Sequence, residues 1–124
     1  MSLNLTGYDI VAWLERQIDF STRVFGPGDR REGIARHIEK ELVEARDSNA
    51  VEEWIDIAIL ALDQAWRAGG SAAAVIEALH RKQQVNIRRS WPDWKSVPFG
   101  YPVEHIKEIS SLDGGSNLMQ LPES

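Results

Sequence analysis

Apolar residues recur every three or four positions along most of the chain, a spacing that predicts α-helices. Glycine, proline and short polar turns interrupt this pattern, and each interruption separates one predicted helix from the next. The chain contains no internal repeat and no low-complexity block. The four predicted helices span residues 7–24, 30–46, 51–66 and 72–89.

The third predicted helix, VEEWIDIAILALDQAW, is apolar almost all the way round, which is typical of a helix buried inside a bundle. Glu53 and Asp56 lie within it on one face, because residues three apart are neighbours on a helix. Burying a carboxylate is unfavourable unless a cation or a hydrogen-bond donor compensates it. We therefore expect a buried helix whose acidic residues have partners elsewhere. Asp63 shares this face, and the sequence assigns it no partner.

Two further carboxylates are expected to lie opposite these. In the second helix Glu41 falls on the apolar face, and Glu44 follows three positions later. A short polar turn, residues 47–49, separates the second helix from the third, so the two helices should be antiparallel neighbours. We expect four carboxylates to converge across this helix–helix interface: Glu41, Glu44, Glu53 and Asp56.

The predicted helix ends carry capping residues. Asp29 with Glu32 has the form of a capping box for the second helix, and Asn49 with Glu52 has the same form for the third. Ser71 is expected to cap the fourth helix after the glycine pair that ends the third.

The end of the chain has a weaker pattern. Pro92 is expected to end the fourth helix, and residues 103–110 are predicted to form a short helix. We expect an all-α, four-helix-bundle-like fold, with a helical catalytic domain at residues 1–94. Residues 95–124 are expected to form an irregular C-terminal extension that packs on this domain or on a partner subunit.

Composition narrows the class of protein. The 124 residues fit one domain, and the absence of cysteine excludes disulfides and thiolate metal sites. The net charge of −5 disfavours a nucleic-acid-binding surface. No apolar run is long enough for a membrane span, and the N-terminus lacks the pattern of a signal peptide. We expect a cytoplasmic protein that binds neither nucleic acid nor membrane.

The four carboxylates predict a site for hard divalent cations. An all-oxygen ligand set favours Mg²⁺ or Mn²⁺ over zinc or copper. Two such ions would balance the four negative charges, and paired ions about 4 Å apart suit displacement at phosphorus. A di-iron site would need two Glu-x-x-His motifs, whereas the sequence has one, at Glu77 and His80. The three histidines, His37, His80 and His105, are interpreted as surface or capping residues.

Polar residues on two other helices are candidates for substrate contacts. The fourth helix has a stripe that begins apolar and ends with Lys82, Asn86 and Arg89. This stripe would contact phosphates, or it would simply mark the helix end that enters water. Gln17 lies among aromatic residues of the first helix, as a pocket amide or as a boundary residue half in water.

Three segments carry a resemblance to a known family: FGPGDRREGIARHIEKELVEA, EEWIDIAILALDQAWRAG and KQQVNIRRSWPDW. Together with the two acidic motifs, they resemble the all-α MazG-like nucleotide pyrophosphohydrolases, and most closely the MazZ-type branch that acts on purine deoxynucleoside triphosphates. The resemblance covers about residues 13–94. It implies hydrolysis between the α and β phosphates to the monophosphate and pyrophosphate, and assembly as homodimers or homotetramers.

The resemblance also implies residue roles. The matched carboxylates would hold two or more Mg²⁺ or Mn²⁺ ions, and Lys82, Asn86 and Arg89 would contact the phosphates. The expected reaction is attack of a water on the α-phosphorus, with Glu41 or Glu44 as general base. Phage members are implicated in making DNA that contains 2-aminoadenine, and there the enzyme converts dGTP into dGMP. The sequence itself does not distinguish guanine from adenine.

We interpret the chain as a metal-dependent purine dNTP pyrophosphohydrolase, acting in the host cytoplasm if phage-encoded. Trp13, Gln17 and Phe20 on the first helix are expected to border the base pocket. Two other classes fit the same residues: a helical interaction module whose acidic line binds a partner, and a nucleotide sensor without turnover. A nucleotide panel assayed by product identity separates all three classes.

Overall fold

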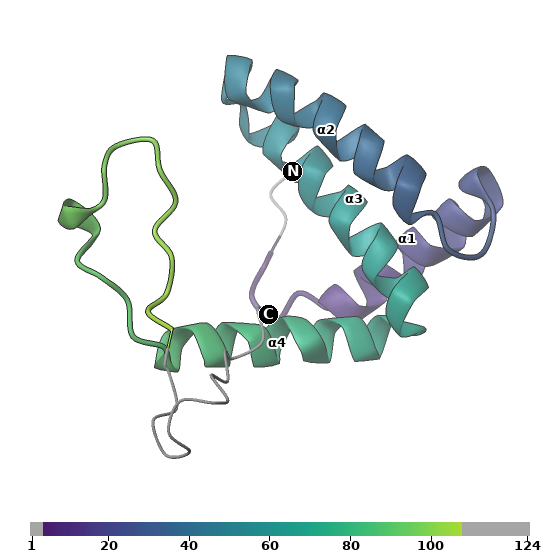
Figure 1. Cartoon of the computed structure of the whole chain (residues 1–124). Coiled ribbons are helices and arrows are strands. Elements are labelled where there is room, and N and C mark those ends of the chain that lie inside the picture. The colour runs from purple at the N-terminus through teal and green to yellow at the C-terminus, as the bar shows by residue number, and fades with distance from the viewer. Residues whose placement is uncertain (1–3, 108–124) are drawn as a thin grey trace, which may run out of the picture. The chain divides into compact units, whose positions relative to one another are not determined.

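Four α-helices and one 3-10 turn form the part of the chain that the computed structural model describes, residues 4–107 (Figure 1). The four helices pack together and these residues contain no β-strand, which confirms the predicted all-α class. None of the helices in this part of the chain is long and apolar enough to cross a membrane. The elements are α1 (Ile10–Phe25), α2 (Arg31–Ser48), α3 (Val51–Gly69), α4 (Ala72–Arg88) and η1 (Trp94–Ser96).

The chain divides into two compact units, Met1–Leu79 and His80–Ser124, and the boundary between them falls inside α4. The predicted division into residues 1–94 and 95–124 stays a proposal, because both of its parts include residues outside 4–107.

The core of the first unit joins α1, α3 and the beginning of α4. Leu14 is fully buried, and Ala72 and Val75 of α4 pack in the same cluster. Half-buried side chains from α1, α3 and α4 surround them: Val11, Trp13, Ile18, Leu62, Ala65, Trp66 and Ile76. These positions recur at helical spacing, so the periodicity of the sequence is what places them on the packed faces.

Of the three predicted caps, one is confirmed and two are wrong. Ser71 caps α4, as predicted, by accepting a hydrogen bond from the backbone N–H of Ala74. At the start of α1, Asp9 caps the helix by accepting from the N–H of Ala12. Asp29 instead accepts from the N–H of Arg31, only two residues on, so no capping box forms and α2 begins one residue later than expected. This geometry is an Asx turn, which competes with helix capping for the same side chain.

The turn between α2 and α3 makes the two helices antiparallel neighbours, as predicted. Asn49 adopts the left-handed conformation (φ 51°), and its N–H donates to the carbonyl of Ala45 at 2.8 Å. Its side chain accepts from the indole N–H of Trp54 at 2.9 Å, so it does not cap α3. The predicted cap by Asn49 and Glu52 is therefore wrong, because Asn49 ends α2 instead.

The expectation of a fully buried third helix is also wrong for the single chain. Val51, Trp54 and Ile55 on α3 are 73%, 41% and 49% exposed. The one residue of α3 that is buried is Asp63, a charged side chain. The helices in the first unit cover only part of the apolar surface of α3.

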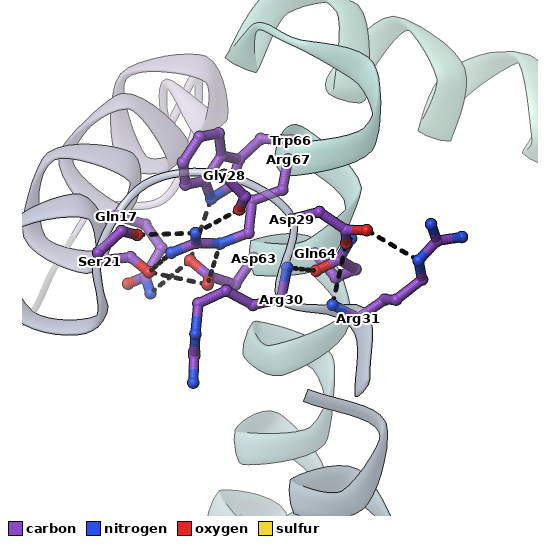
Figure 2. Close-up of polar contacts among 11 residues, drawn as sticks. Gln17, Ser21, Gly28, Asp29, Arg30, Arg31, Asp63, Gln64, Trp66 and Arg67 are labelled. Carbon is purple, nitrogen blue, oxygen red and sulfur yellow. Dashed lines mark hydrogen bonds and ion pairs between the residues drawn. The ribbon is translucent and has the colours of Figure 1, made fainter. Parts of the chain in front are cut away.

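Asp63 has the partner that the sequence did not show. Its carboxylate accepts hydrogen bonds from Ser21 Oγ (2.8 Å), Trp66 Nε1 (3.1 Å) and Arg67 Nε (3.2 Å), with a longer contact to Gln17 Nε2 (3.5 Å). Burial raises the pKa of Asp63, but the hydrogen bonds from Trp66, Ser21 and Arg67 outweigh it and hold the pKa below its ordinary value. Asp63 therefore carries a compensated charge in the core, as Figure 2 shows.

Arg67 extends this network to the loop between α1 and α2. Its side chain is fully buried, and its Nη1 donates to the carbonyls of Gly26 and Gly28 at 2.8 and 2.7 Å. Gln64 links the same loop to α3 by donating to Asp29 at 2.8 Å and accepting from the N–H of Arg30. These bonds fix the start of α2 against α3 and so set the register of the two acidic helices.

The prediction of a short helix at residues 103–110 is wrong for residues 103–107, which have no helical structure. Residues 108–110 lie outside the described part of the chain. The N–H of Ile106 donates to the carbonyl of Ser90 at 2.7 Å, which holds this segment extended beside the end of α4.

Candidate metal centre

Three of the predicted carboxylates meet where α2 faces the first turns of α3. Glu41, Glu53 and Asp56 each offer an oxygen within 4.8 Å of the others. Glu41 and Glu53 are half-buried and Asp56 is exposed. The antiparallel turn brings Glu41 beside Glu53 and Asp56, which lie one helical turn apart on α3.

The size of this cluster fits a hard cation. Oxygen ligands of Mg²⁺ lie about 2.1 Å from the ion, so opposite ligands are about 4.2 Å apart and adjacent ones about 3 Å apart. Oxygens within 4.8 Å of one another reach these separations by small side-chain rotations. With oxygen as the only donor atom of the three carboxylates, Mg²⁺ and Mn²⁺ fit better than softer ions.

Glu44 lies at the edge of this cluster. A hydrogen bond with Glu41, reinforced by the negative charges of Glu41 and Glu53, raises the pKa of the Glu44 carboxyl above its ordinary value. Such a shift means that the carboxylates repel one another when nothing cationic lies between them. Glu44 is exposed and is not one of the three residues whose oxygens converge, so its role as a metal ligand stays a proposal.

His37 contacts the cluster from the preceding turn of α2. Its Nε2 lies 3.1 Å from Glu41 Oε1. The imidazole therefore orients the carboxylate of Glu41, as partners of metal-binding side chains commonly do. The expectation of a surface or capping histidine missed this contact, although the spacing of four residues between His37 and Glu41 could have indicated it.

A pocket of about 420 Å³ begins at these carboxylates. Glu41 and Asp56 line one part of it, while Gln17 and Asp63 line another. The remaining lining is largely apolar or aromatic, with two basic side chains: Phe20, Phe25, Arg30, Ile34, His37, Ile59 and Leu60. An apolar cavity that contains a few convergent polar groups is typical of a small-molecule site.

The three predicted base-pocket residues have different positions. Gln17 and Phe20 line the pocket, where the amide of Gln17 also contacts Asp63. Trp13 packs against the core cluster around Leu14, so its part in substrate binding stays a prediction. Phe25 and Arg30 were not predicted to line a pocket. Arg30 immediately precedes α2, four residues before Ile34, and this spacing is the signal that could have placed it in the pocket.

The predicted phosphate contacts belong to the second unit. Asn86 and Arg89 line a separate cavity of about 290 Å³ together with Trp91, Val103, Glu104, His105 and Lys107. Within it, Arg89 Nη1 donates to Asn86 Oδ1 at 2.9 Å, and Trp91 Nε1 donates to the carbonyl of Asn86 at 2.7 Å. Lys82 is half-buried on α4. The role of Lys82, Asn86 and Arg89 in binding phosphates stays a prediction.

Comparison with known proteins gives one match. A family model described as dATP/dGTP pyrophosphohydrolase, from the MazG-like group, matches residues 13–111. No curated protein and no solved structure matches the chain. The matched region includes the carboxylate cluster, both cavities and all four helices apart from the first residues of α1.

Proposed function

Because the chain belongs to the dATP/dGTP pyrophosphohydrolase family, a group of nucleotide pyrophosphohydrolases, we propose that it converts dGTP, dATP or both into the monophosphate and pyrophosphate. The observation that carries the proposal is the convergence of Glu41, Glu53 and Asp56 at the edge of a pocket with apolar walls. Carboxylates at one end suit cations, which in turn bind phosphates, and aromatic residues elsewhere suit a base.

We assign the metal-binding role to Glu41, Glu44, Glu53 and Asp56, with two or more Mg²⁺ or Mn²⁺ ions per site. When bound, these ions neutralise charge that develops on the phosphoryl oxygens. His37 holds Glu41 in position, and the packing of α2 against α3 keeps the carboxylates close together despite their repulsion.

The proposed reaction is displacement at the α-phosphorus. A water oxygen forms a bond to this phosphorus while the bond from phosphorus to the α–β bridging oxygen breaks, and pyrophosphate leaves. The proton of the water passes to a carboxylate, Glu41 or Glu44. Lys82, Asn86 and Arg89 are proposed to contact the phosphates, and the family match, which includes these three residues, supports this role.

A nucleotide panel tests this function. The protein is incubated with dGTP, dATP, pyrimidine dNTPs, the ribonucleotides and dGDP, with Mg²⁺ or Mn²⁺, and the products are identified. We expect monophosphate and pyrophosphate in equal amounts from purine dNTPs and no activity in the presence of a chelator. Release of inorganic phosphate as the first product would contradict the proposed bond. Binding without hydrolysis would favour a nucleotide sensor, and neither binding nor hydrolysis would favour an interaction module.

The same panel, with 2-amino-dATP added, tests the role implied by the MazZ-type resemblance. We propose that the enzyme supplies dGMP for the synthesis of DNA that contains 2-aminoadenine. Such an enzyme must spare the finished triphosphate, 2-amino-dATP, while it hydrolyses dGTP. Equal hydrolysis of the two would contradict this role.

We propose that the chain assembles as a homodimer or homotetramer. Exposed apolar side chains in the first unit support this, and Val43, Val51 and Ile55 are 66%, 73% and 49% exposed. Apolar surface on this scale is commonly covered by another chain. We expect light scattering after gel filtration to give two or four times the chain mass of 14.0 kDa, and a monomer at micromolar concentration would contradict the proposal.

A further inference from the structure

Arg30 brings a guanidinium group to the pocket that contains the carboxylates. Its side chain lines this pocket, and its guanidinium carbon lies 5.4 Å from the centre of the Phe25 ring. The backbone N–H of Arg30 donates to Gln64, whereas Figure 2 shows its side chain extending away from the Asp63–Arg67 network. Within residues 4–107 the guanidinium forms no hydrogen bond or ion pair, so its donors are available to a ligand.

Arg30 immediately precedes α2 and lies at the end of the pocket wall away from Glu41. Arg30 and Glu41 are eleven residues apart (41 − 30), which corresponds to about 16 Å between their backbone positions along a helix. Ile34 lies between them on the same line of the pocket wall. A nucleotide whose phosphates lie at Glu41 and Asp56 therefore extends its base toward Arg30. Phe25, which lies under the guanidinium, offers that base an aromatic contact.

The acidic residue at this end does not compete for Arg30. Asp63 lines the same pocket, but its carboxylate already accepts from Ser21, Trp66 and Arg67. Its negative charge is balanced by the buried Arg67. The donors of Arg30 are thus available to a base, beside the amide of Gln17, whose Nε2 makes only the long contact to Asp63.

An arginine in this position distinguishes the two purines. Guanine presents two acceptors on one edge, O6 and N7, which match the paired donors of a guanidinium. Adenine presents the acceptor N7 beside the donor N6–H₂, so one donor of the arginine would face another donor. A site that offers two donors therefore favours a 6-oxopurine and leaves a polar group unmatched when adenine binds.

We propose that Arg30 is a specificity-determining residue that donates to O6 and N7 of a 6-oxopurine and makes this chain prefer dGTP to dATP. This inference rests on the proposed function, because it assigns the base end of the same pocket.

The test compares kcat/KM for four substrates that differ in the purine ring: dGTP and dITP carry 6-oxo groups, and dATP and 2-amino-dATP carry 6-amino groups. The wild type is expected to prefer the 6-oxo pair by roughly tenfold or more. Arg30→Met should reduce kcat/KM for dGTP and dITP by roughly tenfold and should change kcat/KM for dATP much less. Arg30→Gln should move the ratio further toward dATP, because glutamine pairs with N6 and N7 of adenine.

Arg36→Met is the matched control, since Arg36 is exposed on α2 and does not line the pocket. It should leave the substrate ratio unchanged. Equal losses on all four substrates in Arg30→Met would overturn the proposal, because they would indicate a phosphate contact or a structural role. A wild type with no 6-oxo preference would overturn it as well.

The binding constants of dGMP and dAMP, measured by calorimetry, test the role of Arg30 independently of catalysis. If the wild type releases pyrophosphate from no nucleotide, the proposed function fails, and the ratio of the two binding constants still decides the role of Arg30. Tighter binding of dGMP that is lost in Arg30→Met supports the proposal. Equal binding of the two monophosphates overturns it.

Discussion

Replacing Glu53 with glutamine is expected to reduce pyrophosphate release from purine dNTPs by at least about 100-fold, because even indirect partners of a metal contribute 10–100-fold. The substitution keeps the shape of the side chain but removes the negative charge of one of the three converging carboxylates. It should also abolish most of the rise in melting temperature that Mn²⁺ produces in the wild type, since a cation that binds only the folded state stabilises it.

The melting temperature without metal distinguishes loss of a ligand from loss of the fold. The charge of Glu53 helps to raise the pKa of Glu44, so removing it relieves repulsion. Glu53→Gln should therefore melt at or above the wild-type temperature without metal. Glu52→Gln is the matched control, since Glu52 is the exposed neighbour and does not belong to the cluster. Full activity in Glu53→Gln, or an equal loss in Glu52→Gln, would contradict the metal centre.

The second large effect is expected at Arg67. Arg67→Met should lower the free energy of unfolding by about 3 kcal/mol, because removing one partner of a buried ion pair leaves the other charge uncompensated. Arg67 is fully buried against Asp63, and it also holds the carbonyls of Gly26 and Gly28. Urea unfolding followed by circular dichroism measures this loss. Activity should fall as well, since the loop that Arg67 holds leads directly into α2.

The loss should depend on pH in a defined direction. The folded state lowers the pKa of Asp63 below its ordinary value of 3.8. The stabilisation that the ionised Asp63 gives the folded state is therefore complete above about pH 5, and it disappears as the pH falls through the folded-state pKa. The stability difference between wild type and Arg67→Met should therefore narrow on acidification. Arg23→Met is the control, because Arg23 pairs with Asp19 on the surface and such exposed pairs contribute about 0–1 kcal/mol. Equal losses in the two variants would contradict the role of Arg67.

Local sequence patterns predicted the four helices and the neighbouring positions of three carboxylates. Glu41, Glu53 and Asp56 could be placed together because helical spacing and a short turn leave two adjacent helices few arrangements. The caps at Asp29 and Asn49 were predicted wrongly, since each side chain had a competing partner close by in the chain, Arg31 and Trp54. A sequence pattern does not rank such competing hydrogen bonds.

The sequence by itself determined that this protein is all-α, that its acidic motifs meet on neighbouring helices, and that it resembles nucleotide pyrophosphohydrolases. These features follow from spacing within one helix or across one turn. Only the tertiary structure showed that Asp63 bonds Ser21, 42 positions away, and that Arg67 closes the loop at Gly26. It also placed Arg30 in the pocket and left Val51 exposed. Such pairings depend on how helices distant in the sequence pack against one another, and the periodicity of a single helix does not contain that information.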